Sequence, residues 1–279
     1  MQSYRTPTEA VRFLRSTSKY AALVRDTYLD ADVIDASQRY GRSGEWAAIR
    51  RLLGTHIPSS TIVDLGAGNG MASRAFAEAG ALRVIAIEPD ASEEVGRGAI
   101  RRCCTGLPVE PVAGFGESLP LGDETAEIVF ARQVLHHTRN LEQTLRECSR
   151  VLRSGGVFLA CREHVADTPA ELVRFLAGHP VHQLTGGENA YRLAEYRHAI
   201  VESGLRLEQQ WGPWDSVINL FPAVTSDDEI PRLTARLLRE RFGFVGTVAA
   251  RAPLIVKLAE KRLRRPRPGR LYSFLATKP

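Results

Sequence analysis

The residues best suited to chemistry lie in a glycine-rich segment between positions 62 and 70. Ile62-Val63-Asp64-Leu65 has the pattern of a buried strand, and Gly66, Gly68 and Gly70 follow it at every second position. Glycines at a strand-to-helix turn let a ligand approach the backbone with no Cβ in the way. This segment therefore predicts a ligand-binding loop.

The spacing of these glycines narrows the class of ligand. A dinucleotide fingerprint needs G-x-G-x-x-G, but the third position holds Met71 when counted from Gly66 and Ser73 when counted from Gly68. The loop also lacks the Lys-Ser/Thr pair of a nucleoside triphosphate site. Glu88 ends a second apolar strand about 20 residues further on, where a carboxylate would meet a ribose diol. An adenosine ligand fits this pattern, whereas NAD and FAD do not.

Histidines at predicted strand ends are candidates for acid–base chemistry. His136 and His137 follow the expected strand 126–131, and His164 follows the expected strand 157–161. Ligands of open α/β sheets lie beyond the carboxyl ends of the strands, so these imidazoles should face the ligand. An imidazole near its usual pKa can accept a hydroxyl proton. We expect His137 first, then His164, then His136, as the base. The alternative is that the histidines only shape or brace the pocket.

An alternating series of strands and helices must position these residues. The apolar pattern predicts an α/β fold, with strands over 62–65, 82–87, 109–113, 126–131, 157–161, 205–211 and 271–277. Helices are expected over 91–102, 141–152 and 193–203, each between two of these strands.

Five ordered motifs resemble those of class I S-adenosylmethionine-dependent methyltransferases, in the branch that acts mostly on small molecules. They are Asp64 to Gly70, Glu88, and the segments 116–121, 134–137 and 151–156, which together cover roughly residues 58–165. One such motif alone is a weak signal, but five in order are a strong one. The resemblance implies a doubly wound, seven-stranded, mostly parallel sheet of the Rossmann-like methyltransferase fold, with S-adenosyl-L-methionine as cofactor.

The resemblance also implies which residues bind the cofactor. At the position where relatives commonly carry an acid for the adenine amino group, this chain has Phe115. Either the Phe115 ring packs against adenine, or Glu117 replaces the acid. The implied cofactor-binding set is Asp64, Gly66, Ala67, Gly68, Asn69, Gly70, Glu88, Pro89, Phe115, Gly116, Glu117, Ala131 and Gln133.

By the same resemblance, residues 1–57 would be lid helices and residues 58–279 the catalytic domain, with insertions at about 162–192 and 212–270. The first helix should begin at the capping box of Thr6 and Glu9. The second insertion predicts helices near 228–241 and 247–264, which would form a cap or a partner surface and are compatible with a homodimer. Four residues would either cover the site mouth or pack helices onto the sheet: Tyr28, Tyr40, Arg42 and Trp46.

Composition limits the location and the cofactor classes. No apolar run approaches the roughly 20 residues that span a bilayer, and residues 1–5 lack a secretory core, so we expect a cytoplasmic protein without membrane insertion. The cysteines at 103, 104, 148 and 161 are too few and too irregular for a disulfide framework or a zinc site. No metal is expected, because His, Asp and Glu do not cluster at ligand spacings along the sequence.

Basic residues near the C-terminus raise the question of nucleic acid. Such a cluster can bind phosphates, but no aromatic residues are interleaved to stack on bases. The N-P-P-Y-type tetrapeptide of amino-methylating nucleic-acid enzymes is also absent at 131–134. We expect methylation of a small-molecule hydroxyl, on a sugar-like or natural-product acceptor; the alternative is a nucleic-acid or macromolecule methyltransferase or binding protein. The cluster comprises Lys257, Lys261, Arg262, Arg264, Arg265, Arg267 and Arg270.

Overall fold

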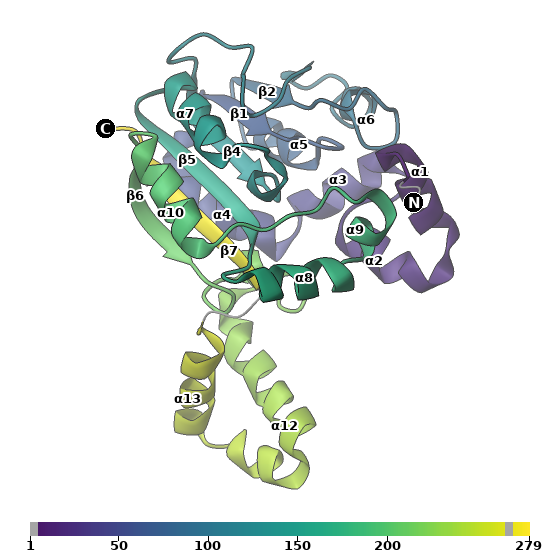
Figure 1. The fold of residues 1–279 in the computed structure, drawn as a ribbon, viewed down its shortest axis with the longest axis vertical. Helices are drawn as coiled ribbons and strands as arrows, with labels where there is room; N and C mark the ends of the chain where they lie inside the picture. The colour runs from purple at the N-terminus through teal and green to yellow at the C-terminus, as the bar shows by residue number, and fades with distance from the viewer. Residues whose placement is uncertain (1–4, 266–269) are drawn as a thin grey trace.

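A seven-stranded sheet with helices on both faces forms the body of the protein in the computed structural model, which describes residues 5–265 and 270–279 (Figure 1). Arg267 and residues 1–4 therefore lie outside the described residues. The strand order is β3-β2-β1-β4-β5-β7-β6, and β7 runs antiparallel to both of its neighbours. The strands are β1 (Thr61–Leu65), β2 (Arg83–Ile87), β3 (Val109–Val112), β4 (Ala126–Arg132), β5 (Leu152–Val165), β6 (Arg206–Trp211) and β7 (Arg270–Thr277). The predicted doubly wound, mostly parallel fold is confirmed.

The centre of the sheet is where the chain changes direction. Strand β1 pairs in parallel with β2 on one side and with β4 on the other, so the register aligns Leu65 with both Ile87 and Ala131. From β1 the chain continues to β2 and β3 on one side, and then crosses to β4 and β5 on the other side. This reversal between β1 and β4 opens a crevice beyond the carboxyl ends of the strands.

Helices cover each face with an apolar core. One core joins Trp46, Phe76 and Phe130, and the other joins Tyr196 and Phe274. The helices of the body are α1 (Pro7–Ser16), α2 (Ala21–Asp26), α3 (Val33–Gly41), α4 (Gly44–Leu53), α5 (Met71–Glu78), α6 (Arg97–Cys103), α7 (Leu141–Val151), α8 (Pro169–Gly178), α9 (Pro180–Thr185), α10 (Leu193–Glu202) and α11 (Val217–Leu220). The predicted capping box of Thr6 and Glu9 starts α1.

The N-terminal aromatics pack helices onto the sheet. Tyr28, Tyr40 and Trp46 are buried, at 3%, 0% and 5% exposure, and their rings form a contact series with Phe76. Arg42 is exposed. Of the two roles foreseen for the aromatics, the structure thus supports packing, because their large apolar surfaces gain more from burial than from covering a polar mouth.

Several elements differ in length from the sequence expectation, and for α6 and β5 the contacts give the physical reason. Helix α6 begins only at Arg97, because the Arg97 side chain donates to the carbonyls of Glu88 and Pro89 and a Cβ on Gly96 would lie 2.3 Å from the Asp90 carbonyl oxygen. Strand β5 runs on to Val165, because β7 pairs with it beyond a register shift between Ala160 and Glu163.

A helical arm projects from the body (Figure 1). It consists of α12 (Ile230–Ala249) and α13 (Pro253–Leu263), so the first predicted helix of this insertion is longer than expected. Gly243, at φ 54° and ψ −126°, has non-helical backbone angles and divides α12 into two helical segments at a kink.

Among the described residues, no helix combines the length and the apolar character needed to cross a membrane.

Candidate active site

The glycine loop leaves its backbone open to a ligand. Gly66 has φ 62°, and a Cβ there would lie 2.5 Å from Cγ2 of Val134, so only glycine fits this position. Gly68 has φ 55°, and a Cβ built on it would meet nothing within 4 Å. The loop therefore packs tightly on one side and faces free space on the other.

Glu88 joins the loop to the end of β2. Its Oε2 accepts a hydrogen bond from the Gly68 N–H and its Oε1 accepts one from the Asp90 N–H, both at 2.8 Å. Glu88 is only 8% exposed, and this burial raises the pKa of its carboxyl. Two fixed carboxylate oxygens at a strand end are suited to accept hydrogen bonds from a diol.

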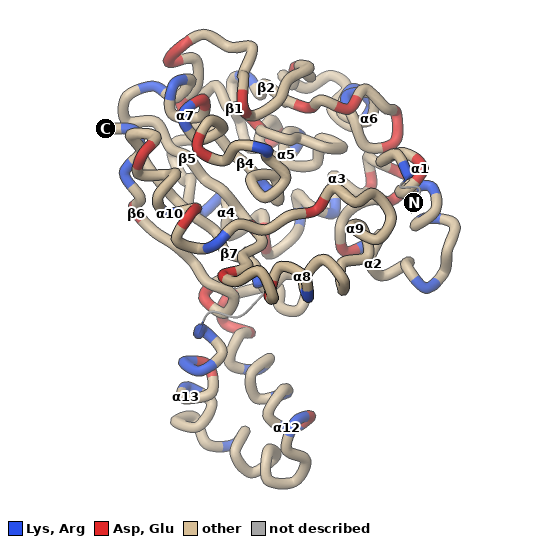
Figure 2. Tube along the Cα trace, viewed as in Figure 1, with Lys and Arg blue, Asp and Glu red and all other residues tan. Residues whose placement is uncertain are grey.

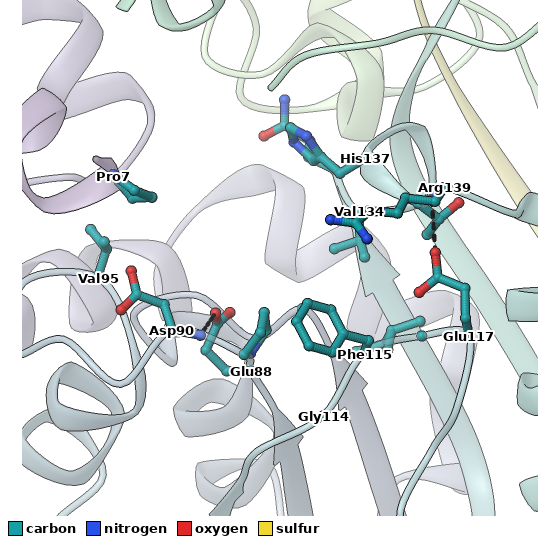
Figure 3. Close-up of a pocket in the computed structure, with 16 residues that line it drawn as sticks. Pro7, Glu88, Asp90, Val95, Gly114, Phe115, Glu117, Val134, His137 and Arg139 are labelled. Carbon is teal, nitrogen blue, oxygen red and sulfur yellow. Dashed lines mark hydrogen bonds between the residues drawn. The ribbon is translucent and has the colours of Figure 1, made fainter. Parts of the chain in front are cut away.

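A cavity of about 800 Å³ lies in front of the loop and Glu88 (Figure 3). It brings together eight residues that the sequence singled out: Gly66, Glu88, Pro89, Phe115, Gly116, Glu117, Gln133 and His137. Pro7, Asp90 and Arg139 also line it and were not predicted. We refer to it as the cofactor-side cavity.

Phe115 and Glu117 have different positions in this cavity. The Phe115 ring is 65% exposed and projects toward the space beside Glu88 (Figure 3). Glu117 Oε1 instead accepts hydrogen bonds from the backbone N–H groups of Arg139, at 2.7 Å, and Asn140, at 3.4 Å. Glu117 therefore holds the start of α7, while the Phe115 ring stays exposed; which of the two meets adenine stays a prediction.

Three residues of the predicted cofactor set lie behind the cavity wall. Asp64, Gly70 and Ala131 are not among the described residues that line either cavity of the site. Asp64 is 2% exposed and accepts a hydrogen bond from Ser73 Oγ–H at 2.5 Å; burial raises its pKa to about 7. These residues support the loop from within, which spacing along the sequence does not distinguish from direct contact.

A second cavity, of about 290 Å³, adjoins the first and contains the histidines. It is lined by Ala67, Gly68, Asn69, His136 and His164 of the predicted set, and by Arg132, His179 and Glu188, which were not predicted as site residues. Gly66, Val95, Gln133 and His137 line both cavities. We refer to this space as the acceptor-side cavity.

His136 is held by a buried acid. Its Nδ1–H donates to Glu163 Oε2 at 2.7 Å, and Glu163 also accepts hydrogen bonds from the backbone N–H groups of Val134 and His136. The Glu163 side chain is fully buried. This carboxylate fixes both the imidazole and the loop that carries it, a role consistent with the bracing alternative for His136.

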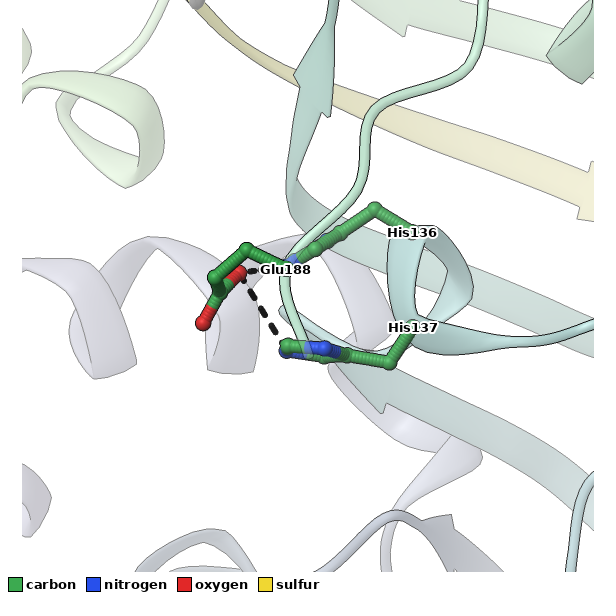
Figure 4. Close-up of side chains that lie close together, drawn as sticks. All are labelled: His136, His137 and Glu188. Carbon is green, nitrogen blue, oxygen red and sulfur yellow. Dashed lines mark ion pairs between the residues drawn. The ribbon is translucent and has the colours of Figure 1, made fainter. Parts of the chain in front are cut away.

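Glu188 faces the histidines from the other side of the cavity (Figure 4). Its Oε2 lies 3.6 Å from His136 Nε2 and 3.7 Å from His137 Nε2, and its Oε1 lies 3.9 Å from His179 Nδ1. The nearest ligand atoms of His136, His137 and Glu188 all lie within 4.8 Å of one another, a spacing that a metal ion could use. Sequence spacing had indicated no such cluster.

The charges around this cluster place a proton on His136 when no metal ion is bound. Burial opposes protonation of His136, but Glu163 and Glu188 outweigh it and raise its pKa to about 9. Burial also opposes ionisation of Glu188, but the nearby imidazoles of His136, His137 and His179 lower its pKa to about 2. A doubly protonated His136 has no lone pair for a metal, so the expectation of no metal stays our prediction.

His137 has the opposite electrostatic setting. Its side chain is 44% exposed because it faces the cavities, while protein surrounds its other sides. Partial burial and the neighbouring charge of His136 lower its pKa below 6.5, so the imidazole is neutral at pH 7. Its Nδ1 lies 3.3 Å from the carbonyl oxygen of Gly187.

Chain separation explains why sequence reasoning missed Glu188, His179 and Glu163 as partners of the histidines. Glu188 and His179 belong to the insertion at 162–192, whose glycines and polar residues indicated only that it lies on the substrate side. The contacts form because Ala166 N–H donates to the Tyr191 carbonyl and Tyr191 Oη–H donates to the Thr138 carbonyl, which closes the insertion over the histidine loop.

Comparisons with known proteins agree with this geometry. A family model described as a methyltransferase domain matches residues 63–160. A ubiquinone biosynthesis O-methyltransferase from Rhizobium etli is 26% identical over 155 residues, covering 54% of this chain and 62% of the relative. A sarcosine/dimethylglycine N-methyltransferase from Halorhodospira halochloris is 32% identical over 128 residues, covering 46% and 44%. The chain thus spans less than two thirds of the length of either relative.

A solved structure shows the same fold. The S-adenosylmethionine dependent methyltransferase from Mesorhizobium loti superimposes with a TM-score of 0.58 at 18% identity, covering 85% of this chain and 98% of that one. The sheet order and the glycine loop define the Rossmann-like methyltransferase fold. Residues 63–160 therefore form a methyltransferase domain with this fold, which agrees with the resemblance of the five motifs to class I S-adenosylmethionine-dependent methyltransferases.

Proposed function

We propose that this protein transfers the methyl group of S-adenosyl-L-methionine to a hydroxyl of a small-molecule acceptor. The observation that carries the proposal is the position of His137, which lines both the cofactor-side and the acceptor-side cavity. Methyl transfer is an in-line displacement, so donor and acceptor must meet at one point with a proton acceptor beside it.

The residues of the cofactor-side cavity suit S-adenosyl-L-methionine. Glu88 offers two carboxylate oxygens to the ribose hydroxyls, Phe115 offers a ring face to adenine, and the open backbone at Gly68 leaves room for the amino-acid end. When bound, this cofactor supplies a methyl group on a sulfonium, whose displacement leaves a neutral thioether.

His137 is placed to take the acceptor's proton. With Nδ1–H donating to the Gly187 carbonyl, Nε2 carries the free lone pair. As the hydroxyl oxygen bonds to the methyl carbon, the pair of the carbon–sulfur bond passes to sulfur and the hydroxyl proton passes to Nε2. Glu188 Oε2, 3.7 Å away, then stabilises the imidazolium. In this proposal His164 and His136 shape the cavity.

The acceptor belongs in the smaller cavity, whose histidines, Arg132 and Asn69 offer hydrogen bonds to a hydroxylated compound. The two relatives act on oxygen and on nitrogen by their names, and a base favours oxygen because a hydroxyl must lose its proton. A sugar-like or natural-product acceptor fits this polarity. The basic residues that suggested nucleic acid are not among the described residues lining either cavity.

Calorimetry with S-adenosylhomocysteine tests the cofactor site. Glu88→Ala should weaken binding about 10- to 100-fold, because hydrogen bonds to a charged group contribute about 1.5–3 kcal/mol. Glu142→Ala is the matched control, since Glu142 is an exposed glutamate on α7. Equal affinity for wild type and Glu88→Ala would show that the ribose lies elsewhere.

The acceptor class requires a second measurement. Release of S-adenosylhomocysteine should be followed by mass spectrometry with catechols, sugars and hydroxylated polyketides, and with amines such as sarcosine. Methylation of a hydroxyl compound supports the proposal, whereas turnover with amines alone would overturn it.

A further inference from the structure

The arm of α12 and α13 exposes an unusual amount of apolar surface. Seven of the twelve large apolar side chains that are exposed in the described chain lie on it, although the arm is a small part of the molecule. Phe244 is 83% exposed, Val245 71% and Leu254 70%. The other four are Phe242, Val248, Ile255 and Leu258. Such a concentration marks a contact surface, whereas single exposed apolar residues are ordinary.

The apolar residues gather at the end of the arm remote from the body. Burial is confined mostly to the first turns of α12, at Ile230, Leu233, Thr234 and Ala235. The stretch 242–250 contains no charged residue. Beyond the kink at Gly243, Gly246 packs so closely on the earlier part of α12 that a Cβ there would lie 1.9 Å from the Leu238 carbonyl oxygen. The tip is therefore a folded turn that presents apolar side chains outward.

Basic residues line the two helices that lead to this tip. Between residues 230 and 265 there are ten arginines and lysines against two glutamates, a net charge of +8, while the whole chain carries only +5. Figure 2 shows the blue positions along both helices of the arm, while its lowest turn is mostly tan. Cavities of about 600 and 630 Å³ between the two helices are lined by apolar side chains together with Arg239, Arg241 and Arg262.

We propose that this arm docks the protein onto an anionic lipid bilayer, with the apolar tip in the interface and the arginines and lysines at the headgroups. An interfacial element of this kind buries its apolar face roughly 5–10 Å into the headgroup and acyl boundary, and basic residues add attraction to anionic lipids. The proposal departs from the sequence expectation of no membrane insertion, which considered only continuous apolar runs.

The charge and the exposed apolar side chains of the arm together favour a bilayer over a nucleic acid or a second copy of the protein. A nucleic acid would complement the arginines and lysines but would leave Phe244, Val245 and Leu254 against water. A second copy of the arm would cover the apolar tip but would bring two segments of charge +8 together, which repel. A bilayer with anionic headgroups complements both features.

The place where the arm joins the sheet determines how the docked protein is oriented. The arm connects β6 to β7, and β7 is antiparallel to β5, so the arm leaves the sheet at the edge where β5 ends. This is also the edge that carries the loops of the cofactor-side and acceptor-side cavities. A protein docked through its arm turns that edge toward the bilayer.

Vesicle sedimentation with the full chain tests the proposal. Wild type should bind vesicles of phosphatidylcholine and phosphatidylglycerol, should bind pure phosphatidylcholine vesicles at least ten-fold more weakly, and should be released by high salt. The double variant Phe244→Ser/Val245→Ser should lose at least ten-fold in binding to the anionic vesicles. Leu82→Ser, at a side chain 67% exposed on the body, is the matched control and should bind like wild type.

Further measurements distinguish binding to a bilayer from dimerisation and from binding to RNA. Phe244→Trp should show a blue-shifted emission and quenching by brominated lipids when anionic vesicles are added. Sedimentation velocity and binding of a fluorescent RNA oligonucleotide are measured in parallel. The proposal is overturned if the serine variant binds vesicles like wild type while remaining folded. It is also overturned if that variant converts a dimer to a monomer, or if RNA binds and vesicles do not.

Discussion

At His137, the adjacent His136 and the loop of Gly187 and Glu188 set the tautomer and the charge. The Gly187 carbonyl accepts the hydrogen bond from Nδ1–H, and Glu188 Oε2 lies 3.7 Å from Nε2. Burial and the charge of His136 lower the pKa of His137. Glu163 beside Nδ1 and Glu188 near Nε2 keep His136 protonated, because they raise its pKa to about 9. At pH 7 His136 is therefore protonated and His137 neutral, so these adjacent histidines are suited to different roles.

Replacing His137 with glutamine tests this assignment. We expect kcat to fall about 100- to 1,000-fold, because the glutamine amide cannot accept the proton. Affinity for S-adenosylhomocysteine should stay within two-fold of wild type. In wild type, kcat/KM should rise with pH up to a pKa below 6.5 and stay flat above it, because only the neutral imidazole is a base.

The control for this variant is His198→Gln, at an exposed position of α10. Full activity of His137→Gln, or an unchanged acidic limb in its pH profile, would place the base elsewhere in the cluster. EDTA should leave the wild-type rate unchanged; loss of activity that a divalent cation restores would instead assign His136, His137 and Glu188 to a metal ion.

Single residues also show what the sequence could predict of the site. Glu88 and His137 followed from their positions at strand ends, since a parallel sheet brings those ends to one edge. Glu188 did not follow, because its contact with His137 depends on how an insertion without strand periodicity folds back. Asp64 was assigned to the cofactor, but its burial under the loop was not visible from spacing.

At the scale of elements, a buried ion pair connects α4 to β4 beneath the site. Glu45 Oε1 lies 2.6 Å from Arg132 Nε, Glu45 Oε2 accepts from Arg132 Nη2 at 3.0 Å, and Arg162 Nη1 lies 3.8 Å from Glu45 Oε2. Glu45 is fully buried. Arg132 is the last residue of β4 and Arg162 lies at the register shift within β5, so one carboxylate of the N-terminal region faces arginines of two strands.

Glu45→Ala should therefore destabilise the fold by about 3–5 kcal/mol, because it leaves buried guanidinium charge without a partner. For a chain of 279 residues, an unfolding entropy of about 2.1 cal/mol/K per residue converts that loss to a Tm lower by roughly 5–9 °C. Calorimetric melting curves measure it. Glu78→Ala, which breaks a half-exposed pair with Arg74, should cost less than about 1 kcal/mol. Similar Tm values for the two variants would contradict the structural role of Glu45.

Element boundaries were predictable where local sequence decides them. The capping box at Thr6 and the glycine turn at Gly66 start their elements where the sequence places them. Long-range pairing decides the others: β7 extends β5 past Cys161, and the bonds of Arg97 to the end of β2 shorten α6. The residue pattern along the chain does not show which distant segments will pair in this way.

At the scale of the whole molecule, the arm is structurally separate from the body that holds both cavities. Within residues 239–258 only Gly246 and Val256 are buried, while Ile230, Leu233 and Leu237 at the base pack into the core of the body. The cavities are lined by residues up to Glu188, so none of the described lining residues belongs to the arm.

A shortened protein, in which a glycine-serine linker joins Leu238 to Ala259, should therefore keep its fold. Both residues line one cavity between the helices, so a short linker spans them. We expect its Tm to stay within about 3 °C of wild type, since little apolar burial is removed, and its affinity for S-adenosylhomocysteine to be unchanged. Binding to anionic vesicles should be lost. A much lower Tm would show that the arm belongs to the core, and weakened cofactor binding would show that the arm acts on the cofactor site across the sheet edge that they share.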